Sequence, residues 1–222
     1  MDISNLKIIG TSHISSKSVK HVSDSIKNEK PDIVCVELDK GRLMSLMEDQ
    51  NSRIPFKAIF DLGLKGYLFA LIGGFAQKRL GRIVNTKPGA DMRAAVETAK
   101  EMKIKTYLID QDVRITLRKF SKAWKFKDTF NLIKEILFGS FRKKNLPFDL
   151  SKVPSDEVIE MMINEVKVKF PSIYKVLIDD RNRVMSRRLV KLMKDNPEAK
   201  ILVVVGAGHK KGMEELLRNS FD

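Results

Sequence analysis

Short apolar runs recur along the chain with the pattern of buried β-strands. Four of them stand out, at Leu6–Ile9, Ile33–Val36, Ile104–Ile109 and Ile201–Val205. The second and fourth runs are continuously apolar rather than alternating, which is typical of strands covered on both faces in a mainly parallel sheet. The pattern therefore predicts an α/β fold with a mainly parallel central sheet and flanking helices.

Helical periodicity separates these runs. Val19, Val22 and Ile26 form an apolar stripe before Pro31, so the first two strands and this helix make a βαβ unit. His21 lies beside this stripe and is expected to be exposed. A final helix is expected to begin at about residue 213. The other apolar stripes are Ala95, Ala99 and Met102 after Asp91, and Met185, Leu189, Leu192 and Met193 before Asn196.

Two segments of the chain are additional to the strands and helices of a minimal α/β domain. Residues 1–222 are expected to form a single domain with helical insertions at about 54–84 and 114–150. The first insertion is apolar and glycine-rich, and it is expected to form a helical hairpin that covers the site or makes a homodimer interface. Residues 114–144 carry ten Lys or Arg and only two acidic residues. Basic helices with an aromatic face bind anionic membrane surfaces or partners, and packing on the chain's own domain is the alternative. The aromatic and aliphatic residues near helical spacing in this second segment are Phe120, Trp124, Phe130, Ile133 and Leu137.

Composition narrows the partners and the compartment. The net charge of +14 favours an anionic partner such as an acidic peptide or lipid, although it also simply promotes solubility. The one cysteine, Cys35, lies in an apolar run, which excludes a disulfide framework and favours a reducing compartment. The start of the sequence lacks the pattern of a signal peptide. The longest uncharged apolar stretch, between Lys65 and Lys78, is shorter than the ~20 residues that cross a bilayer. A cytoplasmic or membrane-associated location is therefore expected.

Polar residues with catalytic chemistry follow each predicted strand. They are His13, Glu37, Asp110 and His209. Since the carboxyl ends of parallel strands meet at one edge of a sheet, where ligands bind in open α/β folds, these residues are expected to converge. Two imidazoles with one or two carboxylates suit a divalent transition metal such as zinc, manganese or cobalt. The alternative is that polar residues simply belong in the surface loops at strand ends.

Glycines accompany both histidines. Gly10 and Gly206 each stand three residues before a histidine, as Gly-x-x-His, and are expected to allow a sharp turn at the strand end. Gly208 is expected to let the backbone approach a bound group. A phosphate cradle is not expected, because Lys211 interrupts the Gly-x-Gly-x-x-Gly spacing and no P-loop Lys-Ser/Thr follows.

Six blocks of the sequence carry a resemblance. They are "GTSHIS", "PDIVCVELDKGR", "PGADMRAA", "LIDQDVRITL", "DDRNRVM" and "VVVGAGHKKGM", and they extend from residue 10 to residue 213. In this order they resemble the TraB/PrgY/GumN family, which includes pheromone-shutdown proteins and the animal Tiki proteins, and most of all its archaeal and bacterial members. The sequence departs from the family at Asp91 and Asp180, where glutamate is common, and at Gln111, where arginine is common.

The resemblance implies a fold, an activity and a site. The implied fold is related to that of the erythromycin esterase and ChaN-like proteins, and the implied activity is a metal-dependent peptidase, a hydrolase acting on a peptide or protein. His13, Glu37 and His209 then hold the metal, while Glu37, Arg181 and Asn182 are catalytic. Many microbial members carry membrane helices after this domain, so the chain is expected to be the soluble part of a longer protein. Nucleic acid is not an expected partner.

Further residues are assigned roles only if the chain is a metal-dependent peptidase. A divalent ion with an open position lowers the pKa of a bound water and polarises a carbonyl. Asp110 is expected to orient an imidazole or to complete the coordination, and Arg181 to stabilise a developing oxyanion. Arg42 and Arg93 are candidate substrate-binding residues, because the planar guanidinium suits carboxylates. Two alternatives stay open: a metal-free hydrolase in which a histidine is the general base, and a non-catalytic module that binds or sequesters a peptide.

Overall fold

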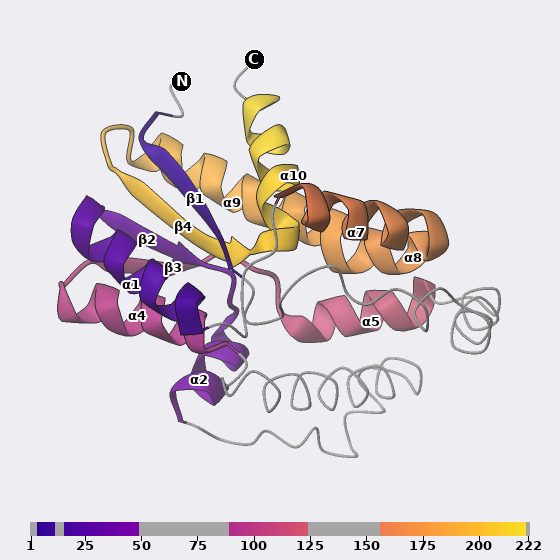
Figure 1. Ribbon diagram of the computed structural model, residues 1–222, viewed down its shortest axis with the longest axis horizontal. Helices are drawn as coiled ribbons and strands as arrows, with labels where there is room; N and C mark the ends of the chain where they lie inside the picture. The colour runs from indigo at the N-terminus through magenta and orange to yellow at the C-terminus, as the bar shows by residue number, and fades with distance from the viewer. Residues whose placement is uncertain (1–3, 12–15, 49–88, 124–155, 221–222) are drawn as a thin grey trace.

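The computed structural model describes residues 4–11, 16–48, 89–123 and 156–220, which form a parallel sheet between two layers of helices (Figure 1). His13, the expected insertion at 54–84 and most of the one at 114–150 lie outside the described residues. The first half contains β1 (Leu6–Thr11), α1 (Ser16–Glu29), β2 (Ile33–Val36), α2 (Lys40–Met47), α4 (Ala90–Glu101), β3 (Lys105–Leu108) and α5 (Val113–Ala123). The second half contains α7 (Asp156–Lys169), α8 (Pro171–Tyr174), a π-helical turn η2 (Lys175–Asp179), α9 (Asp180–Asp195), β4 (Ile201–Gly206) and α10 (Ala207–Arg218).

The four strands run parallel in the order β1-β4-β2-β3. All four predicted strands are confirmed, and β2 has the predicted bounds. β4 lies between β1 and β2, with Val203 opposite Cys35. Since every described strand runs in the same direction, all four carboxyl ends lie at one edge of the sheet, where the site residues were expected.

The two faces of the sheet are covered by different helices, which explains the continuous apolar runs. Side chains alternate between faces along a strand. Ile33 and Cys35 pack with α9 and α10, whereas Val34 and Val36 pack with α1 and α4. Each fully buried Val, Ile or Leu contributes roughly 1.5–3 kcal/mol relative to an exposed one, so a strand covered on both faces retains apolar residues at every position.

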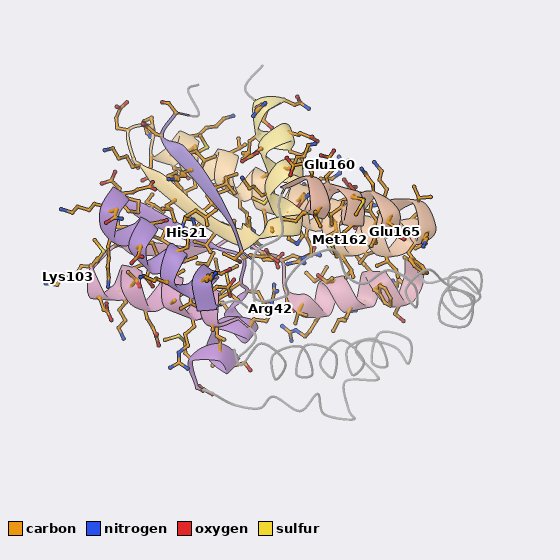
Figure 2. The ribbon with its side chains drawn as sticks, in the orientation of Figure 1. His21, Arg42, Lys103, Glu160, Met162 and Glu165 are labelled. Atoms are coloured by element: carbon orange, nitrogen blue, oxygen red, sulfur yellow. The ribbon has the colours of Figure 1, made fainter. Side chains whose placement is uncertain are left out.

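The predicted helical stripes face these two cores. Val22 and Ile26 of α1 and Ala95 and Ala99 of α4 are buried under one face of the sheet. The stripe of α9 is buried under the other face, at Met185, Leu189, Leu192 and Met193. His21 is exposed on α1, as predicted (Figure 2).

The strand-end glycines differ from expectation. Helix α10 begins at Ala207 rather than near residue 213, so Gly208 and His209 lie in its first turn. Gly206 has φ −60° and ψ 140°, a conformation open to any residue, so the expected glycine-dependent turn is wrong there. Gly10 lies within β1, where an added Cβ would approach the Cα of Ala207 to 3.1 Å. Close packing of β1 against α10, rather than a turn, therefore explains Gly10.

The described part of the basic segment packs on its own domain. In α5 the side chains of Thr116, Leu117 and Phe120 are buried, and the helix contacts η2 and α8. Phe120 therefore does not belong to an exposed aromatic face, because its side of α5 packs against the rest of the domain. The remaining aromatic residues of the predicted membrane-facing stripe lie outside the described residues. Within the described ranges, no helix has the length and apolar character needed to cross a bilayer.

Candidate functional site

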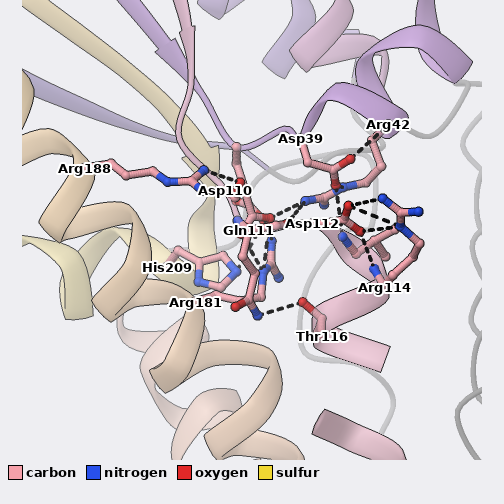
Figure 3. Close-up of polar contacts among 12 residues, drawn as sticks. Asp39, Arg42, Asp110, Gln111, Asp112, Arg114, Thr116, Arg181, Arg188 and His209 are labelled. Atoms are coloured by element: carbon pink, nitrogen blue, oxygen red, sulfur yellow. Dashed lines mark hydrogen bonds and ion pairs between the residues drawn. The ribbon is translucent and has the colours of Figure 1, made fainter. Parts of the chain in front are cut away.

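Five polar side chains meet at the carboxyl edge of the sheet, and we call them the edge cluster. Figure 3 labels Asp110, Arg181 and His209 among them. They come from four places: the ends of β2 and β3, the first turn of α9 and the first turn of α10. The convergence expected from parallel strands is therefore present among the described residues. The members of the edge cluster are Glu37, Asp110, Arg181, Asn182 and His209.

Glu37 is a buried carboxylate at the centre of the edge cluster. Its Oε2 accepts a hydrogen bond of 2.6 Å from the backbone N–H of Gly206, which caps the start of α10. Its Oε1 is ion-paired with Nη2 of Arg181. A helix N-terminus and a guanidinium both favour negative charge beside them. The side chain is therefore held in one orientation, with Oε1 also facing His209.

His209 is held through both of its ring nitrogens. Nδ1 lies 2.6 Å from Oδ1 of Asn182, and Nε2 lies 3.3 Å from Oε1 of Glu37. An amide oxygen only accepts, so Nδ1 is the donor to Asn182. In a neutral imidazole Nε2 then carries a lone pair, which faces a carboxylate oxygen. A positive species, either a proton on Nε2 or a metal ion, would remove the repulsion between these two lone pairs, and Nη2 of Arg181 is already paired with the same Oε1.

Arg181 links the two carboxylates of the edge cluster. Its Nη2 lies 2.6 Å from Oδ2 of Asp110 and is also paired with Glu37. Its Nη1 donates over 3.2 Å to the carbonyl of Leu177 in the π-helical turn, an element that often occurs at functional sites. Burial alone would lower the pKa of Arg181, but Glu37 and Asp110 outweigh burial and raise its pKa above the ordinary value. The guanidinium is therefore permanently charged and fixed.

Among the described residues, Asp110 contacts arginines. Besides Arg181, it pairs with Nη2 of Arg42, and its backbone carbonyl accepts a 2.6 Å hydrogen bond from Arg188. Burial alone would raise the pKa of Asp110, but Arg181 and Arg42 hold it below its usual value. Because Asn182 is the partner of His209 Nδ1, Asn182 takes the orienting role that was expected of Asp110 at this histidine.

Arg42 connects helix α2 to the edge cluster. Asp39 caps α2, accepting from the backbone N–H of Arg42 at 3.1 Å and from its Nε at 2.6 Å. Oδ2 of Asp39 also accepts a 3.2 Å hydrogen bond from the backbone N–H of Val113, at the start of α5. Burial alone would lower the pKa of Arg42, but its contacts with Asp110 and Asp39 raise it. Asp39 and Arg42 therefore tie the ends of β2 and β3 together.

The other candidates lie further out. Arg93 pairs with Glu97 of its own helix at 2.8 Å and reaches the carbonyl of Leu46, so it is tied to the last turn of α2. Gln111 donates a 2.8 Å hydrogen bond to the Thr116 hydroxyl in α5. An added Cβ at Gly208 would meet Cδ1 of Ile163 at 3.2 Å. The close approach at Gly208 is therefore to α7.

Sequence reasoning missed two residues of the site. Arg188 was not singled out, although it stands seven residues after Arg181 and therefore on the same side of α9. Asp39 was not assigned a role either, although an aspartate three residues before Arg42 at a strand-to-helix junction is a helix-capping pattern. Both residues could have been found from the sequence, because helical spacing places Arg188 beside Arg181 and helix capping accounts for Asp39.

Two donor atoms of the edge cluster have the separation of two ligands of one metal ion, although one of them, Oε1 of Glu37, is also paired with Arg181. Among the described residues, no group of three or more His, Cys, Asp or Glu is placed to hold one, and His13 lies outside them. The described donors are therefore Nε2 of His209 and Oε1 of Glu37, 3.3 Å apart. Two ligands of one tetrahedral ion, each ~2.0–2.2 Å from it, are separated by about that distance. The pair fits two adjacent ligands of a zinc-like ion.

Comparisons with known proteins extend over almost the whole chain. The chain is 32% identical over 218 residues to an uncharacterized protein of Methanocaldococcus jannaschii, with 96% of this chain and 53% of that protein covered. It is 24% identical over 238 residues to the human TraB domain-containing protein, with 96% and 63% covered, and 23% identical to the mouse protein of that name. The chain thus spans about half to two thirds of the length of these relatives. The model of the TraB/PrgY/gumN family matches residues 2–220, a range that contains the whole edge cluster, and the chain belongs to this family.

Proposed function

We propose that the chain is a metal-dependent hydrolase that cleaves a peptide, with a divalent zinc, manganese or cobalt ion held by Glu37, His209 and His13. The observation that carries the proposal is the geometry of one imidazole. Asn182 accepts from Nδ1 of His209, so Nε2 is turned, as a lone pair, toward the Glu37 carboxylate 3.3 Å away. Metal-binding histidines typically donate their other ring N–H to an oxygen in this way.

The chain's own side chains supply the remaining parts. A bound ion would activate a water and polarise the scissile carbonyl. Arg181 holds Glu37 and cannot lose its charge, because two carboxylates surround it. A guanidinium has five N–H donors, and the contacts of Arg181 with described residues use four. The proposal assigns the remaining Nη1–H to a developing oxyanion, where one preorganised donor contributes roughly 2.7–4 kcal/mol to catalysis.

A metal-free hydrolase is the second candidate, and the same geometry supports it. If the positive species between Nε2 and Oε1 is a proton, His209 and Glu37 form a buried ion pair. Loss of that proton would make the imidazole a general base for water. This version agrees with the proposed relation of the fold to the erythromycin esterase and ChaN-like proteins. A module that binds a peptide without cleaving it is the third reading of the same edge cluster.

One experiment separates these readings. The full chain is incubated with a defined peptide mixture, and products are identified by mass spectrometry before and after dialysis against a chelator. We expect cleavage that stops with the chelator and returns with zinc, manganese or cobalt. His209→Ala and Glu37→Gln should abolish it, because each removes a proposed ligand. His21→Ala is the matched control, since it removes an exposed imidazole on α1.

The other outcomes each favour a different reading. Cleavage that survives the chelator but not His209→Ala favours the metal-free hydrolase. Peptide retention without products favours the binding module. Equal cleavage by wild type, His209→Ala and Glu37→Gln contradicts both enzymatic readings, because the edge cluster would then not be the catalytic site.

A further inference from the structure

A glycine in α10 lies directly against the amide that holds His209. Gly212 stands three residues after His209, so both face the same side of α10, toward α9. A Cβ added at Gly212 would lie 2.5 Å from Nδ2 of Asn182. Ordinary nonbonded contacts between heavy atoms are at roughly 3.5 Å, so a methyl group and the present position of Asn182 are incompatible.

Asn182 has little freedom to avoid such a methyl group. It is buried, and its Oδ1 accepts from His209 at 2.6 Å while its Nδ2 faces Gly212. A displacement of about 1 Å is needed to restore normal contact, and a hydrogen bond of this kind is lost when stretched by that much. The missing side chain at residue 212 is therefore what allows Asn182 to reach His209.

We propose that Gly212 is a positioning residue that acts through Asn182 to fix the tautomer and orientation of His209. It serves the same edge cluster as the proposed function, but the contact between residue 212, the amide and the imidazole exists whether a metal ion or a proton faces Nε2. The specific claim is that glycine at 212 lets Asn182 hold a proton of His209 on Nδ1, and so keeps Nε2 directed at Glu37.

The direction in which Gly212→Ala changes the melting temperature distinguishes a positioning role for Gly212 from an effect on the helix alone. Inside a helix, replacing glycine by alanine ordinarily stabilises the fold, because glycine loses more backbone entropy on folding. Gly212→Ala should instead lower the melting temperature, because the added methyl displaces a buried amide. In an Asn182→Ala background the same substitution should raise the melting temperature, since the obstacle is gone.

The test reads the imidazole directly. The full chain, labelled with ¹⁵N and kept in chelator at a pH where imidazoles are neutral, is examined by long-range ¹H–¹⁵N spectroscopy. Only three histidines are present, so the ring of His209 is assigned from its loss in His209→Ala. We expect the Nδ1–H tautomer in wild type and a shift toward the Nε2–H tautomer in both Gly212→Ala and Asn182→Ala. The double variant should resemble Asn182→Ala, and Glu215→Ala, an exposed change on the same helix, should resemble wild type.

Contrary results are equally clear. An Nε2–H tautomer in wild type, or an unchanged tautomer together with a raised melting temperature in Gly212→Ala, would overturn the proposal. If Gly212→Ala does not fold, the double variant decides: folding of the double variant supports a collision with Asn182, and its failure beside a folded Asn182→Ala overturns it. Because the spectra are recorded in chelator, failure of the metal-dependent function leaves this result unaffected.

Discussion

Replacing Asp110 by asparagine removes the charge that Arg181 and Arg42 share. The change keeps the size of the side chain, so it opens no cavity. The Asp110 side chain is 0% exposed, that of Arg181 is 14% exposed and that of Arg42 is 33% exposed. Asparagine leaves a largely buried guanidinium facing a neutral amide, while Glu37 remains its only carboxylate among the described contacts.

The expected loss of unfolding free energy is about 3 kcal/mol. Removing one partner of a buried ion pair costs about 3–5 kcal/mol, and the remaining pair with Glu37 places this case at the lower end. The pair with Arg42 adds less than about 1 kcal/mol, because solvent screens a side chain that is one third exposed. For a chain of this size the melting temperature should fall by roughly 6–12 °C.

The pH dependence of the unfolding free energy provides a second test of the interaction between Asp110 and the arginines. Because the arginines hold the pKa of Asp110 below its usual value, its contribution to stability is present above the unfolded pKa of about 4. It is lost as the pH falls through the lower folded pKa. Asp110→Asn removes this titration, so its unfolding free energy should decline less steeply than that of wild type below about pH 4.

The measurement is urea unfolding followed by circular dichroism at neutral pH and at a series of acidic pH values. Asp24→Asn is the control, because it makes the same chemical change at an exposed position of α1. An Asp110→Asn variant within about 0.5 kcal/mol of wild type, with the same acid dependence, would refute the claim that this carboxylate holds the edge cluster together.

Three further predictions concern single residues away from this pair. Ser186→Ala should leave the unfolding free energy unchanged or raise it by up to about 1 kcal/mol, because the buried Ser186 hydroxyl has no hydrogen-bond partner among the described residues. A thermal melt should therefore show an equal or higher melting temperature. Cys35 should not react with a thiol reagent at pH 8 until urea unfolds the chain, because burial in β2 raises its pKa to about 12. Gly89→Ala should destabilise the chain by about 1–2 kcal/mol in urea unfolding, because Gly89 has φ +81° at the start of α4; a gain in stability there would contradict the backbone assignment.

The fold was predictable where the chain is covered on both sides. Continuous apolar runs identified β2 and β4 because residues of either parity, such as Cys35 and Val36, are buried against helices. The strand β3 is shorter than the predicted Ile104–Ile109, since it lies at the edge of the sheet and pairs only with β2 among the described strands. The α10 boundary was misplaced because Gly206 at its N-cap and Gly208 in its first turn are residues that normally argue against a helix.

The sequence predicted where the candidate site lies, but not which side chains pair with each other there. Parallel strands bring Glu37 and Asp110 to one edge, and that much follows from topology. Which arginine each carboxylate contacts depends on how α9 lies across that edge, and Arg181, in the first turn of α9 after the π-helical turn, reaches both. The contact between residue 212 and Asn182 likewise arises from the packing of α10 against α9, which no local pattern in the sequence encodes.

Stoichiometric metal binding tests the central claim most directly. The full chain is stripped with chelator, dialysed separately against zinc, manganese and cobalt, and analysed for bound metal beside a thermal melt of each sample. We predict about one ion per chain in wild type and in His21→Ala, and loss of that ion in His209→Ala and Glu37→Gln without loss of folding. Wild-type protein that retains none of the three metals, or a folded His209→Ala that retains as much as wild type, would contradict the proposal that His209 and Glu37 hold a metal ion.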